Sequence, residues 1–203
     1  MKAIKNYLNY YLYLTYYYLN IRYNQIKNYN DPKLRYLNKA MLFALLTHHG
    51  CRQRYDSKYP YYYHLDMVLK FALKFSHIVD FNINVCLGAL FHDLIEDCRL
   101  TYNDVKDKWG EEVADIVFAC TELRGRNRDE RHGPEYYALL QTTELGSYDK
   151  ICDVIANMTQ GTLTGSSMLA KYRKNYPKFK SLLYRDKFKE MFDYIESNLL
   201  TDK

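Results

Sequence analysis

Apolar residues recur at intervals of three and four positions through most of the chain beyond residue 31. In the first such segment the apolar positions are Leu34, Leu37, Met41, Ala44 and Leu45. This spacing places them on one face of a helix. Asp31 is a suitable N-cap, Pro32 suits the first turn and Gly50 suits the end of a helix. The pattern therefore predicts a helix over 32–50.

The same helical period continues in the middle of the chain. A polar and aromatic stretch, CRQRYDSKYPYYYH, predicts a loop that leads to a second helix from Leu65 to Ser76, with His64 at its entrance. A small-residue pair, Gly88 and Ala89, lies within a further run of helical spacing over 82–97. Both segments are apolar enough on one face to pack in a core.

Helix signals extend to the C-terminus. Thr101, with Asp104 three residues later, is typical of a helix start. The charged loop RGRNRDERHGPE precedes helical segments at 136–141 and 147–158, and the remainder predicts two or three helices broken by Pro177. Alternating strand patterns never exceed a few residues, and no repeat occurs. We therefore expect an all-α helical bundle.

The first thirty residues differ from the rest, being nearly all Tyr, Asn, Leu, Ile and Lys. We expect a Tyr/Asn-rich N-terminal extension over 1–30 and a single helical domain over 31–203. Rows of tyrosine could dock as a helix or stack on nucleic-acid bases. A weakly ordered, dispensable leader is the interpretation we favour, with initiation downstream of Met1 as an open alternative.

Composition narrows the class of protein. The 203 residues are 48% hydrophobic and 26% charged, with eight Gly and four Pro, which excludes disordered and fibrous chains. A net charge of +5 would attract phosphorylated molecules. Because the Lys and Arg residues are spread along the chain and not clustered, we do not expect nucleic acid as a partner. No apolar run is long enough for a membrane span, and no signal peptide precedes the domain, so we expect a cytoplasmic protein.

The cysteines do not suggest a disulfide framework. They are odd in number, form no C-x-x-C pair and fall within apolar helical patterns. The five are Cys51, Cys86, Cys98, Cys120 and Cys152. We expect reduced thiols in the core.

The stretch LGALFHDLIEDC gathers one imidazole and three carboxylates at the end of an apolar helix. Glu96 follows His92 by four residues and Asp97 follows Asp93 by four, so each carboxylate lies one turn beyond a potential ligand. The C-terminal end of a helix carries negative partial charge, which opposes carboxylates there. A bound cation would offset that repulsion.

Two more polar residues stand out in apolar surroundings. His64 enters the second predicted helix, and Asp153 interrupts the apolar helix that contains KICDVIANM. A lone buried carboxylate must be paired, neutralised or metal-bound, because burying an uncompensated charge is costly. Asn157, one turn later, shares the face of Asp153. Alone, either residue is better explained as a satisfied buried polar group.

Together these segments resemble a known family. HDLIED followed by TYNDVKDKWGEEVADIVFACTEL, preceded by YPYYYHLDMV and followed by KICDVIANM, is similar to the HD-domain phosphohydrolases, in particular the RelA/SpoT hydrolase-like branch with the small alarmone hydrolases. The similarity covers roughly 49–157. It implies an HD-domain helical bundle and a nucleotide substrate.

The resemblance also implies roles for individual residues. One divalent metal ion, usually manganese in this branch, would be held by His64, His92, Asp93 and Asp153. Mixed imidazole and carboxylate ligands also suit iron, cobalt or zinc. The acidic pair Glu96 and Asp97 matches the residues that orient or deprotonate the attacking water.

Substrate contacts are implied less completely. The corresponding residues are Arg54, Tyr55, Lys58 and Asn157. Relatives usually carry two arginines after the last metal ligand, where this chain has Val154 and Thr159. Four arginines of the charged loop are candidates to replace them: Arg124, Arg126, Arg128 and Arg131.

The sequence thus favours a metal-dependent nucleotide phosphohydrolase, most concretely a 3′-pyrophosphohydrolase of the guanosine alarmones ppGpp and pppGpp. Two alternatives stay open: an HD phosphohydrolase of another nucleotide, such as a phosphorylated dinucleotide cofactor or a nucleoside triphosphate, and a non-catalytic nucleotide-sensing module. The oligomeric state is not specified by the sequence.

Overall fold

The structure is a computed structural model that describes residues 32–57 and 59–201. The predicted extension over 1–30, the N-cap Asp31 and the candidate substrate contact Lys58 lie outside the described residues. The chain divides into two compact units, Met1–Phe43 and Ala44–Lys203. Of the first unit, only the beginning of one helix is described, and every site discussed below lies within the second.

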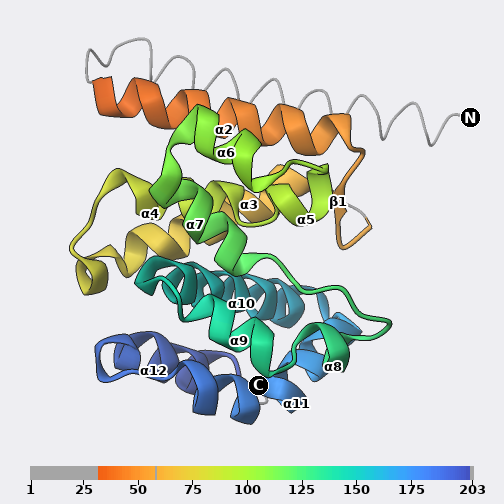
Figure 1. Ribbon diagram of the computed structural model, residues 1–203. Helices are drawn as coiled ribbons and strands as arrows, with labels where there is room; N and C mark the ends of the chain where they lie inside the picture. The colour runs from red at the N-terminus through yellow and green to blue at the C-terminus, as the bar shows by residue number, and fades with distance from the viewer. Residues whose placement is uncertain (1–31, 58, 202–203) are drawn as a thin grey trace, which may run out of the picture. The chain divides into compact units, whose positions relative to one another are not determined.

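The described part of the chain is almost entirely helical (Figure 1). Its α-helices are α2 (Pro32–Gly50), α3 (Tyr61–Lys74), α4 (Ile83–Phe91), α5 (Leu94–Cys98), α6 (Tyr102–Trp109), α7 (Glu111–Cys120), α8 (Arg128–Arg131), α9 (Pro134–Leu140), α10 (Glu144–Thr164), α11 (Ser167–Leu183) and α12 (Lys189–Asn198). Short 3-10 turns lie at Ser76–Val79 and Asp186–Phe188, and β1 (Arg54–Tyr55) pairs antiparallel with β2 (Tyr59–Pro60). The predicted all-α fold class is confirmed.

Helix α10 forms the centre of the second unit. It packs against α3, α4, α7, α9 and α11 (Figure 1). Its apolar face is fully buried, including Ile151, Ile155 and Met158 at 0% exposure. Burying each of these side chains stabilises the fold by about 1.5–3 kcal/mol. A polar side chain on this helix is therefore held rigidly in the interior.

Close approach between α4 and α10 depends on a glycine. A Cβ at Gly88 would overlap the Asp149 carboxylate and lie 2.8 Å from the Ile116 Cγ2 atom. Asp149 itself is 0% exposed, and neither of its carboxylate oxygens has a hydrogen-bond partner. Burial raises the pKa of Asp149 well above its usual range, so this side chain is a neutral carboxylic acid packed among apolar groups.

Two helix boundaries differ from the predictions, and both concern the candidate site. Helix α3 begins at Tyr61, one turn before the predicted start, with Pro60 as N-cap and no side-chain cap. The helical stretch predicted over 82–97 is interrupted: α4 ends at Phe91, Asp93 has φ −104° and ψ 4°, and α5 begins at Leu94. Because the break lies at the His-Asp pair, Glu96 and Asp97 occupy the first turn of a new short helix.

Two further expectations were wrong. Pro177 lies inside α11 and does not end it. An internal proline costs about 3 kcal/mol, which burial of Tyr176, Phe179 and Leu183 on the same helix offsets. Cys51 is exposed, whereas the other four cysteines are buried, as expected; all five are free thiols.

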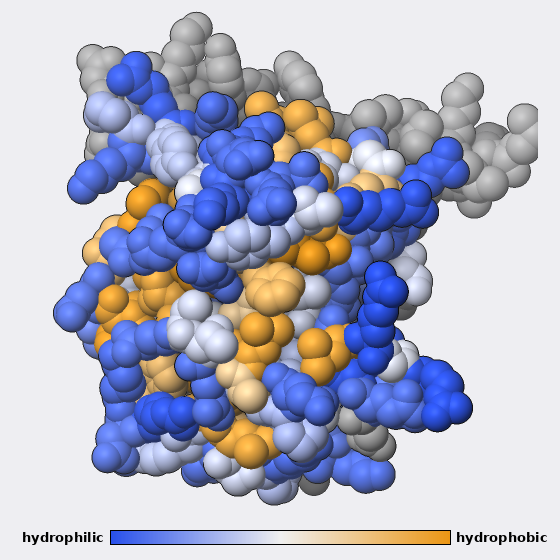
Figure 2. All heavy atoms as spheres, in the orientation of Figure 1, coloured by the Kyte–Doolittle hydropathy of each residue, from blue (hydrophilic) through white to orange (hydrophobic). Residues whose placement is uncertain are grey.

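Hydrophilic side chains cover much of the face shown in Figure 2, with apolar side chains in patches between them.

The capping box predicted at Thr101 is present, with Asp104 accepting a hydrogen bond from the Thr101 backbone. Among the described residues, no helix combines the length and the apolar character that crossing a membrane requires.

Candidate metal centre and active site

Three separate elements contribute the polar residues that the sequence singled out. His64 projects from the second turn of α3, and Asp153 from the middle of α10. His92 and Asp93 occupy the break between α4 and α5. The structure brings all four side chains together inside the second unit.

The donor atoms converge closely. The Nε2 atoms of His64 and His92 lie 3.2 Å apart. Asp153 Oδ1 is 3.1 Å from His64 Nε2 and 3.8 Å from His92 Nε2. Asp93 Oδ2 is 2.8 Å from His92 Nε2 and 3.8 Å from His64 Nε2. The Nε2 atoms of both imidazoles thus lie within 3.8 Å of one carboxylate oxygen from each aspartate.

This arrangement fits a metal ion. The donor atoms of His64, His92 and Asp153 all lie within 4.8 Å of one another, and the three residues are buried. His92 Nδ1 lies 3.0 Å from the Ala89 carbonyl, so Nδ1 is a donor nitrogen, and the neutral ring would offer its Nε2 lone pair to a metal that displaces the second proton. Two imidazoles and two carboxylates are a common ligand set for divalent transition metals. The cluster could therefore hold such an ion.

Neighbouring side chains hold the carboxylates in place. The Tyr61 hydroxyl donates a hydrogen bond to Asp93. The Asn157 amide donates to Asp153 Oδ1 at 2.5 Å, and the Lys150 ammonium lies 2.9 Å from Asp153 Oδ2. Each oxygen of Asp153 thus has its own partner, and the orientation of the carboxylate is fixed.

The electrostatics of the cluster favour ionised carboxylates. Burial alone would raise the pKa values of Asp93 and Asp153. For Asp93 the His92 imidazole outweighs burial, and for Asp153 the Lys150 ammonium does, so both pKa values are lowered. Burial lowers the pKa of His92, but the charge and hydrogen bond of Asp93 outweigh it and raise that pKa to about 9. Both carboxylates are therefore ionised, and a cation in the cluster or a proton on His92 balances their charge.

The acidic pair lies beside the cluster. Desolvation raises the pKa of Glu96 to about 7, with the negative charges of Asp93 and Glu122 adding to the effect. Desolvation likewise raises the pKa of Asp97 to about 6, again with help from Asp93. A carboxyl group that titrates near neutral pH can accept and return a proton during catalysis. Both residues are thus chemically suited to acid–base work.

Glu122, which the sequence analysis did not single out, connects this pair to the charged loop. Its backbone N–H donates to Glu96 Oε2 at 3.1 Å. Its carboxylate lies 2.9 Å from Arg131 Nε and 2.5 Å from His132 Nε2. The start of the loop is thereby anchored beside the acidic pair.

The candidate nucleotide contacts are divided. The Tyr55 hydroxyl donates to Asn157 Oδ1 at 2.9 Å, and the Tyr55 ring stacks on His64 with centroids 4.7 Å apart. Both residues therefore adjoin the cluster. Arg54 lies on β1 and is exposed.

Two arginines of the charged loop form ion pairs with nearby glutamates. Arg126 Nε is 3.4 Å from Glu130, and Arg131 is paired with Glu122. Arg124 is exposed, and Arg128 begins the short helix α8. The ion pairs of Arg126 and Arg131 weaken the hypothesis that this loop supplies phosphate contacts.

The sequence analysis missed two direct partners of the cluster, Tyr61 and Lys150. Each lies three residues before a predicted ligand, His64 or Asp153, on the same helix. This i, i+3 spacing was the available signal. For Tyr61 it was hidden because the start of α3 was placed one turn too late.

Comparison with known proteins supports a functional interpretation of this geometry. No protein-family model matches the chain. A curated guanosine-3′,5′-bis(diphosphate) 3′-pyrophosphohydrolase of Aquifex aeolicus (strain VF5) is 31% identical over 97 residues. That match spans 47% of this chain and only 13% of the relative.

Among solved structures, a metazoan ortholog of SpoT, described as hydrolyzing ppGpp and playing a role in starvation responses, matches with a TM-score of 0.62. The match covers 86% of this chain and 99% of that chain at 18% identity. The chain therefore has the helical fold of a SpoT-like hydrolase. The resemblance to the RelA/SpoT hydrolase-like branch is confirmed in fold and in part of the sequence.

Proposed function

We propose that the chain is a metal-dependent phosphohydrolase that removes the 3′-diphosphate from ppGpp or pppGpp and leaves GDP or GTP. The observation that carries this proposal is the convergence of two imidazoles and two carboxylates from α3, the α4–α5 break and α10. Burying two carboxylates beside two imidazoles costs several kcal/mol unless they are compensated, and a divalent ion would compensate both at once. The activities of the two similar proteins make ppGpp the first substrate to test.

We assign His64, His92, Asp93 and Asp153 as ligands of one divalent ion, most concretely manganese, with iron, cobalt or zinc compatible with the same donors. A bound ion would act as a Lewis acid toward a phosphate group of the substrate. Tyr61 and Asn157 would keep the two carboxylates oriented for that ion. Loss of such a supporting partner typically lowers metal affinity or activity by about 10- to 100-fold.

Glu96 and Asp97 are assigned to positioning and deprotonating the attacking water. In the reaction, the oxygen of water bonds to phosphorus, the bond from phosphorus to the 3′ oxygen breaks, and the 3′ oxygen takes up a proton. The near-neutral pKa values of both carboxyls allow them to move these protons. Tyr55 and Asn157 would contact the nucleoside, and Arg54 and Lys58 are further candidate contacts to the purine or to a phosphate.

The proposal is tested by measuring pyrophosphate and orthophosphate release from a panel of nucleotides, with Mn²⁺ and with chelator. We expect Mn²⁺-dependent release of pyrophosphate from ppGpp. Glu96→Gln and Asp97→Asn should each reduce turnover by about 10²- to 10⁴-fold, the usual contribution of acid–base groups. Release of orthophosphate from another nucleotide would contradict the assignment of ppGpp as substrate and would assign that nucleotide instead. Tight binding of ppGpp without turnover would indicate a sensing module and would contradict the proposal.

A further inference from the structure

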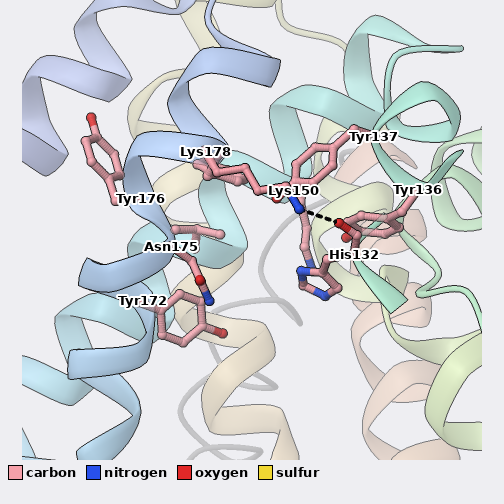
Figure 3. A pocket seen from close by; sticks show the side chains of 10 residues that line it. His132, Tyr136, Tyr137, Lys150, Tyr172, Asn175, Tyr176 and Lys178 are labelled. Atoms are coloured by element: carbon pink, nitrogen blue, oxygen red, sulfur yellow. Dashed lines mark hydrogen bonds between the residues drawn. The ribbon is translucent and has the colours of Figure 1, made fainter. Parts of the chain in front are cut away.

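A pocket lies next to the metal cluster, between α9, α10 and α11. It encloses about 570 Å³, including the part open to solvent. We call it the Lys150 pocket, and the lining residues that matter here are Tyr136, Tyr137, Lys150, Tyr172, Asn175 and Lys178. Figure 3 shows Tyr172, Asn175 and Lys178 projecting from α11, opposite the tyrosines of α9. None of these residues belongs to the predicted site.

The pocket is positively charged. Two of its lining residues, Lys150 and Lys178, carry ammonium groups, and no Asp or Glu is among the described residues that line it. Lys178 reaches from α11 to the carbonyl of His132, to which it donates at 3.1 Å. An ammonium has three donors, so Lys178 retains hydrogen atoms for another acceptor. Cations between aromatic walls favour an anionic ligand.

Lys150 connects the pocket to the cluster. Its side chain is buried, at 9% residue exposure, and its ammonium contacts Asp153 Oδ2. The other oxygen of Asp153, Oδ1, faces His64 and Asn157. The pocket therefore adjoins the cluster on the side of Lys150, which lies about two turns of α10 before Asn157.

A buried hydroxyl also marks this pocket as a binding site. The Tyr136 hydroxyl is buried and faces the Lys150 ammonium, to which a dashed line joins it in Figure 3, and no described residue accepts its own hydrogen. Tyr136 is 1% exposed, and its ring centroid lies 6.0 Å from the Lys150 ammonium. A buried donor left without an acceptor costs about 1–3 kcal/mol. A ligand with acceptor oxygens would satisfy both the hydroxyl and the remaining donors of the two lysines.

We propose that the Lys150 pocket binds the terminal phosphate of the substrate's diphosphate, beyond the phosphorus under attack. This inference rests on the proposed function. With the nucleoside beside Tyr55 and Asn157 and the reacting phosphorus at the cluster, the next phosphate extends along α10 toward Lys150 and Lys178. The pocket would thus select a diphosphate leaving group over a monophosphate, and it would bind pyrophosphate.

The test is calorimetric titration of the metal-free protein with pyrophosphate and with orthophosphate. Lys178 is exposed, so Lys178→Gln should fold normally. We expect this variant to weaken pyrophosphate binding by roughly tenfold, the usual loss for one hydrogen bond to a charged group. Lys174→Gln is the matched control: it removes the same charge from an exposed position on α11 outside the pocket and should leave binding unchanged.

A second measurement separates ligand binding from a structural role of Lys178 in holding the His132 carbonyl. With ppGpp and its 3′-monophosphate counterpart as substrates, Lys178→Gln should raise the KM for ppGpp selectively, and Lys178→Arg should restore it. Equal pyrophosphate binding in wild type and Lys178→Gln would overturn the inference, even if ppGpp is hydrolysed. Lys178-dependent pyrophosphate binding without hydrolysis of any nucleotide would instead overturn the proposed function and leave the pocket standing.

Discussion

Asp149 and Asp153 lie one turn apart on α10, and both are almost completely buried, at 0% and 4% exposure. Asp153 contacts His64, Lys150 and Asn157. Asp149 has no hydrogen-bond partner for either oxygen and lies against Gly88. The pKa of Asp153 is lowered and that of Asp149 is raised. Because Asp149 and Asp153 are about equally buried, their different hydrogen-bond and ion-pair partners distinguish the candidate ligand from the core residue.

The largest expected effect is a difference in enzyme activity between variants of Asp153 and Asp149. Asp153→Asn removes a proposed ligand charge and the ion pair with Lys150, and we expect ppGpp hydrolysis to fall by more than about 100-fold, beyond the loss typical of outer-shell partners. Asp149→Asn, an equally buried substitution on the same helix, should leave turnover close to wild type. Steady-state rates for both variants decide the matter, and similar losses in the two would contradict the distinction.

The next effect concerns the packing of Asp149. Gly88→Ala places a methyl group into the Asp149 carboxylate and close to Ile116, and overpacking of this kind costs about 1–3 kcal/mol. Adding Asp149→Ala should recover much of that loss, because the overlapping carboxylate is gone. Urea unfolding of both single variants and the double variant measures the coupling. If the changes in unfolding free energy of the two single variants simply add up in the double variant, the predicted overlap between Gly88→Ala and the Asp149 carboxylate is contradicted.

Metal removal should affect the Asp149 and Asp153 variants differently, because Asp153 is a proposed ligand and Asp149 is not. A ligand present at 100 times its Kd stabilises a folded protein by about 2.7 kcal/mol, so chelation should lower the Tm of the wild type. Asp149→Asn should show the same drop, whereas Asp153→Asn should show little change. Thermal scans with Mn²⁺ and with EDTA provide the measurement. A full metal-dependent shift in Asp153→Asn would remove this residue from the ligand set.

The smallest effect is a pH dependence that belongs to Asp149. Its pKa is raised in the folded state, so above the ordinary carboxyl pKa the folded chain holds one proton more than the unfolded chain. Its contribution to stability is therefore present at acidic pH and is lost as pH rises toward the folded pKa, by up to about 1.4 kcal/mol per pH unit. Asp149→Asn should lack this slope when unfolding is measured from about pH 5 to about pH 7. Parallel pH curves would show that Asp149 is ionised in the fold.

Local spacing in the sequence carried much of what the structure contains. The capping box at Thr101, the helix over 32–50 and the helical segment around Asp153 follow from residue periods that one helix imposes on its own neighbours. The four residues assigned to the metal could be named as one set only through the resemblance to the HD-domain phosphohydrolases, because His64 and Asp153 taken alone are better explained as satisfied buried polar groups. That they lie together depends on packing between helices, which local periodicity does not specify.

The errors have a common origin in tertiary contacts that override local preference. Pro177 was expected to break a helix, yet buried side chains on both sides of it keep α11 continuous. The interruption at His92 and Asp93 was missed because the apolar period continues across it. Lys150 was overlooked because a lysine in an apolar helix carries no signal of its ion pair until the position of Asp153 is known.

The proposed ligands come from α3, the α4–α5 break and α10, so a ribosome adds Asp153 only after the other three. A ribosome-bound chain that has not yet delivered α10 already holds both imidazoles and Asp93, but it lacks the fourth donor and the helix on which the core packs. Any activity of this centre would therefore begin only when α10 has joined the earlier helices, and a nascent chain that ends before α10 would be inactive.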